Sequence, residues 1–283
     1  MDVILKNKSI KLTLAQKKVL KFILNNLNET IFMTASFLGK KTKVSEATII
    51  RLAQALEFDG FPAFQKYLRQ LHQERFTTVR RLENSLDLPK TSSPFVNTIQ
   101  MDIKNISAMA ETISEKDFNQ VVTLLWKAKK ISIIGLRSAF SMAVYLKFGL
   151  RFLGKDAELI QPSHGDIWDQ LAGLTKNDLA VGISFPRYSN LTVDAVAFAR
   201  EKQCKIIALT DTPVSPLTPY SDWVLIAPCQ SDSYMDSFTA PMALLHALLT
   251  AMSLQKPGTA MTAFKKLETL WDKQHIYFSP AEK

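Results

Sequence analysis

The chain has 283 residues, of which 47% are hydrophobic and 22% are charged, and its formal net charge is +9. This composition excludes a disordered chain and is sufficient for two domains with hydrophobic cores. We expect no membrane span, because no apolar run approaches the roughly 20 residues that a span needs. The first twenty residues contain no apolar block typical of a secretory signal, and Cys204 and Cys229 have no metal-binding spacing. We therefore expect a cytoplasmic protein without a metal or a cofactor.

The positive charge is concentrated at the start of the chain. Residues 1–80 contain 14 Lys and Arg against 6 Asp and Glu, whereas residues 81–283 contain 21 against 20. This asymmetry predicts two domains with different partners and makes the basic block a candidate for nucleic-acid binding. On charge alone, a basic surface that has no nucleic-acid partner is the better explanation.

The basic block begins with helical patterns. Apolar residues recur at helical spacing over Leu12–Leu27, with Thr13 as a possible N-cap. A short helix is expected over residues 34–39, and a third helix follows Ser45 and ends near Leu56. Ser45 is a favourable N-cap for this third helix. A short helix, a tight turn and a capped helix together form the layout of a helix-turn-helix.

The third helix has an apolar inner face and an outer face made by Ala47, Thr48 and Arg51. The second helix of a helix-turn-helix enters the major groove, where Arg51 can donate two hydrogen bonds to a guanine edge. The predicted DNA-binding residues are Lys40, Lys41, Ser45, Ala47, Thr48 and Arg51. The alternative is a three-helix packing unit without nucleic acid.

A further helix is expected over Ala63–Val79, and residues 83–98 have the Pro- and Ser-containing composition of a linker. We therefore predict a helix-turn-helix domain over residues 1–80, a linker over residues 81–104 and a second domain over residues 105–283.

The second domain alternates strands and helices after two leading helices, Ile99–Thr112 and Glu115–Lys127, the latter capped by Ser114. The predicted strands are Ile131–Ile134, Ala157–Ile160, Leu179–Ser184, Lys205–Leu209 and Trp223–Ala227. The predicted helices are Ser138–Leu153, Asp166–Leu174, Leu191–Lys202, a short one near Ser215–Tyr220, and Thr239–Leu254. This alternation predicts an α/β fold in which helices cover both faces of a parallel sheet, as in a flavodoxin-like doubly wound sandwich.

Two strand-to-helix loops form the candidate ligand site. Arg137 and Ser138 follow the first strand, and Ser184, Arg187 and Ser189 follow the third. In a flavodoxin-like sheet the strand order reverses between these two strands, and ligands bind there. Hydroxyl groups, arginines and helix N-termini suit an anion such as a phosphate ester or a carboxylate. The alternative for Ser138 and Ser189 is a plain N-cap role.

Several motifs carry a resemblance to a known family. Those in the basic block are Phe32–Ala35, Val44–Thr48 and Leu56–Phe61. Those in the second domain are Gly135–Ser138, Ser184–Ser189 and Ala208–Asp211. The first set resembles the helix-turn-helix domain of the RpiR family of bacterial transcription regulators, and the second resembles the sugar isomerase (SIS) domain that these regulators carry. The resemblance covers almost the whole chain in the order of the family.

The resemblance implies a regulator of a double-stranded DNA operator whose five-stranded SIS domain binds a sugar phosphate or a related anionic sugar metabolite. It assigns the phosphate-holding hydroxyls to Ser138, Ser184, Ser189 and Thr192. The chain departs from the family pattern where glycine or serine is common, since these positions hold Lys43, Arg137, Pro186 and Arg187.

The SIS fold also serves isomerases, which need a base near the sugar carbons. Glu158 and Glu201 are poorly placed for that role, His164 is the best candidate, and His246 is expected to be a core or interface residue. We therefore predict a regulator rather than an enzyme. The alternatives are a phosphosugar isomerase with an accessory helical domain, and a metabolite-binding protein whose basic domain meets RNA or an acidic protein.

A single helix-turn-helix contacts too few base pairs to select a site, so a homodimer or homotetramer is expected. The predicted interface consists of the apolar helix Thr239–Leu254 and the helix Phe140–Phe152. The alternative is that both helices simply cover the sheet.

Overall fold

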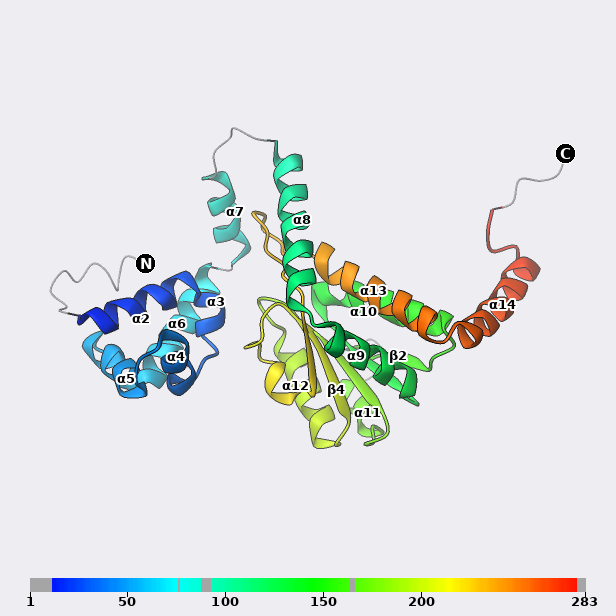
Figure 1. Cartoon of the computed structure of the whole chain (residues 1–283), viewed down its shortest axis with the longest axis horizontal. Coiled ribbons are helices and arrows are strands. Elements are labelled where there is room, and N and C mark those ends of the chain that lie inside the picture. The colour runs from blue at the N-terminus through cyan, green and yellow to red at the C-terminus, as the bar shows by residue number, and fades with distance from the viewer. Residues whose placement is uncertain (1–11, 76, 88–92, 163–165, 279–283) are drawn as a thin grey trace. The chain divides into compact units, whose positions relative to one another are not determined.

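The computed structural model describes residues 12–75, 77–87, 93–162 and 166–278. Contacts divide the chain into an N-terminal unit, Met1–Thr91 with Asp232–Met235, and a C-terminal unit, Ser92–Ser231 with Asp236–Lys283. Figure 1 shows that the first is helical and that the second contains the sheet.

The N-terminal unit is built around one central helix. Its helices are α2 (Leu14–Asn25), α3 (Leu27–Thr30), α4 (Ala35–Thr42), α5 (Glu46–Ala55), α6 (Gly60–Arg75) and α7 (Thr78–Leu86). Helix α5 packs against α2, α4 and α6, and its Ile49 and Leu52 are fully buried. The predicted N-cap Thr13 is confirmed, because its hydroxyl accepts from the Gln16 N–H and the Gln16 side chain returns a bond to the Thr13 N–H.

The segment predicted as a linker is largely helical. Residues 81–86 of this segment belong to helix α7. Helix α8 (Pro94–Thr112) begins five residues before the predicted start at Ile99. Pro94 stands at the start of α8, where proline fits because the N–H that it lacks would have no partner within the helix. Pro89, Thr91 and Ser92, which suggested a linker, lie outside the described residues. The domain limits 1–80 and 105–283 stay predictions.

The C-terminal unit contains one parallel sheet. Its strands are β1 (Ile131–Ile134), β2 (Ala157–Leu159), β3 (Leu179–Ile183), β4 (Lys205–Thr210) and β5 (Trp223–Ile226). They lie in the order β2-β1-β3-β4-β5, with Ile131 paired to Ala157 on one side and to Leu179 on the other. The predicted fold class and the reversal of strand order between β1 and β3 are therefore confirmed.

Helices cover both faces of this sheet (Figure 1). The helices of this unit are α8, α9 (Glu115–Lys127), α10 (Phe140–Phe152), α11 (Ile167–Ala172), α12 (Asn190–Glu201), α13 (Thr239–Gln255) and α14 (Pro257–Gln274), with short 3-10 helices η1 (Arg137–Ala139) and η3 (Thr218–Tyr220). Helix α14 packs on α10 and α13 rather than on the sheet. Successive strand residues point to opposite faces. Accordingly Ile133 packs with α9, α10 and α13, whereas Ile134 packs with α11 and α12.

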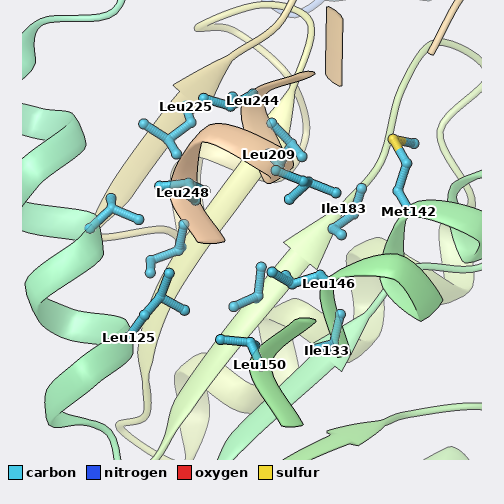
Figure 2. Packing of buried hydrophobic residues seen from close by; sticks show 14 of the residues in the cluster. Leu125, Ile133, Met142, Leu146, Leu150, Ile183, Leu209, Leu225, Leu244 and Leu248 are labelled. Carbon is cyan, nitrogen blue, oxygen red and sulfur yellow. The ribbon is translucent and has the colours of Figure 1, made fainter. Parts of the chain in front are cut away.

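The larger core lies between the sheet and helices α9, α10 and α13. Figure 2 shows Leu125, Leu146 and Leu248 from these helices gathered over Ile183 and Leu209 of the sheet. All five side chains are nearly inaccessible to solvent. Helix α14, which the sequence analysis did not predict, continues the chain after α13 and packs against α10 and α13.

Candidate functional site

The loop after β1 turns sharply at Gly135 into η1. A Cβ atom on Gly135 would lie 3.1 Å from the carbonyl oxygen of Ala139 and 3.1 Å from the Cβ of Ala143. A glycine therefore allows η1 and α10 to pack closely on the end of β1. Ser138 lies in η1, is exposed, and caps neither η1 nor α10 with its side chain, so its interpretation as an N-cap is wrong.

The loop after β3 runs from Ser184 to Ser189, directly before α12. Ser184 is 3% exposed, and its N–H donates to the carbonyl of Leu209 in β4 at 3.2 Å. Ser189 is the N-cap of α12, because its hydroxyl accepts from the N–H of Thr192 at 3.4 Å. The N-cap interpretation of Ser189 is therefore confirmed, and its hydroxyl proton is still able to donate to a ligand.

Both loops place an arginine in the left-handed backbone conformation. The φ angle is 56° at Arg137 and 62° at Arg187. The other non-glycine residues with positive φ in the described ranges lie at helix C-termini, where this conformation is common; they are Lys43, Glu57, Gln203 and His275. A left-handed backbone costs a residue with a side chain roughly 1–2 kcal/mol. The two loops carry arginine side chains in spite of that cost, and backbone strain of this kind clusters at functional sites.

A cleft of about 640 Å³ lies between the loops that follow β1, β2 and β3. Its walls are formed by Leu136, Arg137, Phe140, Gln161, Pro162, Ser189 and Leu191. Two of the predicted ligand residues, Arg137 and Ser189, line this cleft. The other four are not in its walls; they are Ser138, Ser184, Arg187 and Thr192.

Thr192 lies in the first turn of α12 and is completely buried. Its hydroxyl has no hydrogen-bond partner among the described residues. A buried polar atom without a partner costs roughly 1–3 kcal/mol. This hydroxyl lies in the first turn of α12, near the backbone N–H groups that carry the positive end of the helix dipole, and its hydrogen-bonding capacity is unused.

A tyrosine–aspartate pair fixes the loop after β3 to the end of β4. The Tyr188 hydroxyl donates to Oδ1 of Asp211 at 2.6 Å, and the Thr210 hydroxyl contacts the same oxygen at 3.3 Å. Burial raises the pKa of Asp211 to about 6, although the hydrogen bond from Tyr188 lowers it in part. Burial also raises the pKa of Tyr188, so its hydroxyl stays protonated and donates. This pair was not predicted from the sequence, although the motifs Ser184–Ser189 and Ala208–Asp211 each contained one member.

Of the candidate bases of an isomerase, the two that the structure describes, Glu158 and Glu201, do not line the cleft. Glu158 pairs with Lys130 at 2.7 Å. Glu201 is the exposed last residue of α12, and His164 lies outside the described residues. His246 was expected in the core or at an interface, and the core position is wrong because this residue of α13 is exposed. Its Nδ1 contacts the Tyr145 hydroxyl at 3.0 Å.

The helix-turn-helix turn is compact between α4 and α5. A Cβ atom on Gly39 would lie 2.9 Å from the carbonyl oxygen of Val44, so α4 and the turn meet at a position where only glycine fits. Lys43 ends α4 in the left-handed conformation, with φ at 58°. Ser45 caps α5 by accepting from the Thr48 N–H at 3.3 Å, which confirms the predicted N-cap.

The predicted DNA-binding residues lie on and before the outer side of α5. Ala47 and Arg51 are exposed, as are Lys40 and Lys41 in the last turn of α4. Arg51 has no hydrogen bond or ion pair with any described residue. Thr48 is half-buried, and its hydroxyl lies 2.9 Å from that of Ser45, so it has less freedom to contact a base than the sequence suggested.

The chain matches the helix-turn-helix domain of the rpiR family over residues 1–75 and the SIS domain over residues 124–251. It is 30% identical, over 219 residues, to an uncharacterized HTH-type transcriptional regulator of Haemophilus influenzae, which covers 76% of this chain and 75% of the relative. The chain belongs to the RpiR family of transcription regulators. This confirms the predicted family and its SIS domain.

Other relatives agree with this membership. The HTH-type transcriptional regulator HexR of Pseudomonas aeruginosa is 24% identical over 253 residues, which cover 86% of this chain and 85% of that protein. The sugar isomerase domain of an RpiR transcription factor from Sphaerobacter thermophilus is 26% identical with a TM-score of 0.59, over 62% of this chain and 97% of that one. The NanR protein of Vibrio vulnificus, solved in complex with ManNAc-6P, shares the fold at 20% identity and a TM-score of 0.66, over 96% and 98% of the two chains.

Three positions for which the resemblance suggested glycine have a left-handed backbone. Positions 43, 137 and 187 hold a lysine and two arginines, and all three adopt positive φ. The backbone geometry that glycine favours is thus kept while cationic side chains are added. No helix in the described ranges is long and apolar enough to span a membrane.

Proposed function

We propose that this RpiR-family protein is a DNA-binding transcription regulator whose SIS domain binds a phosphorylated sugar or a related anionic sugar metabolite. The observation that carries the proposal is the cleft at the reversal of strand order, which Arg137 and Ser189 both line. Its volume of about 640 Å³ lies in the range of small-molecule sites.

The groups around this cleft favour an anion. Arg137 brings a positive charge and a planar set of hydrogen-bond donors to its walls. Ser189 opens α12, whose N-terminal N–H groups point toward an incoming anion, and the unpartnered hydroxyl of Thr192 lies one turn further on. Leu136, Phe140 and Leu191 supply apolar walls for the carbon skeleton of a sugar derivative. Ser138, Ser184 and Arg187 complete the proposed ligand set from the same two loops.

The cleft supports sensing more than catalysis. The side chains described in its walls can donate hydrogen bonds and exclude water, whereas isomerisation needs a base poised beside a sugar carbon. Membership in a family of regulators favours the same interpretation. Turnover of a phosphosugar by the purified protein would instead favour the isomerase alternative.

For DNA binding we propose that α5 lies in the major groove. Its exposed Arg51 reads a base edge, and Ala47 allows close approach. Lys40 and Lys41 neutralise phosphates from the end of α4. Ser45 orders the start of the recognition helix through its cap. A partner such as RNA or an acidic protein would bind without the sequence discrimination that a DNA operator requires.

We further propose a homodimer or homotetramer that presents two recognition helices, with its interface on α10. Val144 and Phe148 of α10 are 42% and 60% exposed, although both are large apolar residues. Helix α13 contributes less than the sequence suggested, since Leu245, Leu248 and Met252 are buried inside the unit. For α13 the alternative of a helix that covers the sheet thus accounts for most of its apolar surface.

The test of the ligand is thermal denaturation of the full-length protein with sugar phosphates, including ManNAc-6P, and with sugar acids and amino sugars. A ligand at 100 times its Kd stabilises the folded state by about 2.7 kcal/mol, which raises Tm by several degrees. We expect a rise with one or more phosphorylated sugars. A rise with uncharged or cationic sugars alone would contradict the proposed anion site.

The test of the DNA partner is binding to genomic fragments over a range of salt concentrations. Neutralisation of phosphates by lysine and arginine makes the logarithm of the binding constant fall with the logarithm of the salt concentration. A steep slope together with selection of a few fragments supports the proposal. A steep slope without selection would leave only a non-specific polyanion surface.

A further inference from the structure

The loop after β3 touches a second segment through an aromatic contact. Phe185 follows Ser184 directly and is 5% exposed. Its ring lies against the ring of Phe238, with the centroids 5.5 Å apart and an interplanar angle of 51°. Phe238 is the residue from which α13 starts. A displacement of the loop Ser184–Ser189 would therefore act directly on the N-terminus of α13 through this contact.

That N-terminus has one local bond, in which the Ser237 hydroxyl oxygen accepts from the Thr239 N–H at 3.3 Å, but it has no negative charge from its own sequence. Phe238 has no side-chain acceptor, and no acidic residue stands in the first turn of α13. The first N–H groups of a helix have no partner within the helix, so they favour a negative charge nearby. Because α13 has 17 residues and contributes to the larger core, the way its N-terminus is held affects the packing of that core.

Asp102 of α8 supplies the missing anion from another helix. One carboxylate oxygen of Asp102 accepts from the Ser237 hydroxyl, and the other accepts from the Thr239 hydroxyl at 2.8 Å. Ser237 and Thr239 flank Phe238 in the chain, so the carboxylate holds the residues on both sides of the aromatic contact. Hydrogen bonds to a charged acceptor are about twice as strong as neutral ones.

A second bond ties the same face of α8 to the same loop. Asn105 lies three residues after Asp102, so the two side chains project from one side of the helix. It is 2% exposed, and its Nδ2 donates to the carbonyl of Gln230 at 2.8 Å. The N–H of Ser237 donates to the carbonyl of Cys229 at 3.1 Å, which closes the loop between β5 and α13 on itself. Helix α8 is therefore fastened to a closed loop.

We infer that Asp102 and Phe238 are positioning residues that couple the loop Ser184–Ser189 to helix α8. The inference rests on the proposed function, since it assumes that the ligand binds at this loop. Ligand contacts at Ser184 and Ser189 move Phe185, Phe185 moves Phe238, and the Asp102 carboxylate transmits the change to α8. Along the chain α8 follows the N-terminal unit, so its attachment is where a change in the SIS domain reaches the segment that leads to the DNA-binding domain. Coupling of this kind is reciprocal.

The first test is hydrogen exchange of the full-length protein, measured without ligand or DNA. Phe185→Leu keeps an apolar side chain but removes the ring contact with Phe238. We expect the amides around Asp102 and Asn105 in α8 to exchange at least about tenfold faster. The matched control is Phe152→Leu, which removes ring contacts with Phe148 and Trp271 in the same unit and is expected to leave α8 unchanged.

The second test runs in the opposite direction. Asp102→Asn removes the charge and one acceptor oxygen, and we expect faster exchange both in α8 and in the loop Ser184–Ser189. The control is Asp117→Asn at the start of α9, where the carboxylate accepts from the Ser114 hydroxyl at 2.7 Å. If Asp102→Asn fails to fold, Thr239→Val removes one hydroxyl donor at nearly constant volume and should give a smaller change at the same two places.

The outcomes separate the two proposals. Faster exchange in Phe185→Leu that is confined to β3 and α12, with α8 unaffected, would overturn the coupling. So would an effect of Asp102→Asn on α8 alone. Neither experiment contains a sugar or DNA, so the coupling can stand if every sugar phosphate fails to bind, and it can fail while a sugar phosphate binds normally.

Discussion

The recognition helix and the ligand edge present their functional groups in opposite ways. On α5, Ala47 and Arg51 are exposed and take no part in the packing of the N-terminal unit. At the ligand edge, Ser184 is 3% exposed, Thr192 is completely buried, and Tyr188 is bonded to the half-buried carboxylate of Asp211. The exposed side chains of α5 are thus not needed for the packing of their unit, whereas the side chains of the ligand edge also stabilise the fold.

This difference teaches which measurements can be separated. A substitution on the outer side of α5 is expected to change DNA binding and to leave the free energy of unfolding within about 0.5 kcal/mol. A substitution at the ligand edge changes ligand affinity and stability together, because the same atoms serve both. Each variant is therefore measured for binding and for unfolding. The contrast between the two regions fails if an α5 variant also changes the free energy of unfolding, or if a ligand-edge variant changes ligand affinity alone.

The largest effect is expected for Ser184→Ala combined with Ser189→Ala. Each lost hydrogen bond to a charged ligand costs roughly 1.5–3 kcal/mol, so ligand affinity should fall at least about 100-fold in calorimetry. Loss of the α12 N-cap at Ser189 should also lower the free energy of unfolding by about 1 kcal/mol. DNA affinity without ligand should stay unchanged. Unchanged ligand affinity would mean that the ligand binds elsewhere, and Ser253→Ala on α13 is a suitable control.

A pH-dependent loss of stability is expected from Asp211. Its pKa is about 6 in the folded protein and 3.8 ordinarily, so the folded state holds a proton that the unfolded state releases between these values. The free energy of unfolding should be highest below about pH 4 for this group and should fall, by on the order of 2 kcal/mol, as pH rises through about 6. Asp211→Asn should remove this fall in urea denaturation, whereas Asp194→Asn on α12 should keep it. An identical pH dependence in both variants would contradict the buried state of Asp211.

Arg51→Ala sharpens the contrast from the DNA side. We expect a loss of about 1–3 kcal/mol of discrimination at one base position of the operator, because a bidentate contact to a base is removed. The unfolding transition should not move, since no described residue bonds to Arg51. Competition binding with single-base operator variants measures the discrimination. If all sequences weakened equally, Arg51 would be a phosphate contact.

The smallest effect is expected for Lys40→Ala or Lys41→Ala. Each should weaken binding to all sequences alike and lower the salt slope by about one unit, because one phosphate contact is lost. Lys176→Ala, an exposed lysine of the C-terminal unit, serves as the control and should leave the slope unaltered. A change of base preference in Lys40→Ala would assign that lysine to base recognition instead.

Local signals made much of the fold predictable. Thr13, Ser45 and Ser114 cap their helices as predicted, because N-capping depends on neighbouring residues alone. Short runs rich in Ile, Val and Leu located the strands, and the flavodoxin-like arrangement supplied the reversal of strand order between β1 and β3. Helix α7 was missed because residues 83–98 were assigned to a linker from their proline and serine content, although Val79, Leu82 and Leu86 recur at helical spacing.

The candidate site was predictable as two loops but not as an assembly. Arg137 and Ser189 meet at one cleft because the strand order brings their loops together. The pairing of Tyr188 with Asp211 spans 23 positions and depends on how far β3 and β4 extend, which sequence spacing does not reveal. The carboxylate partner at the start of α13 was equally hidden, since Asp102 is 137 positions from Thr239.

The bond between Asp102 of α8 and the start of α13 limits where domains can be exchanged between relatives. The SIS match begins at residue 124, yet Asp102 and Asn105 of α8 hold the loop that starts α13. A chimera joined at residue 124 would inherit a foreign α8, and a junction at 105 would still lose Asp102. A junction before Pro94 carries α8 and α13 together as one inherited piece. We therefore expect functional chimeras of sensor and DNA-binding domains to need their junction on the N-terminal side of α8.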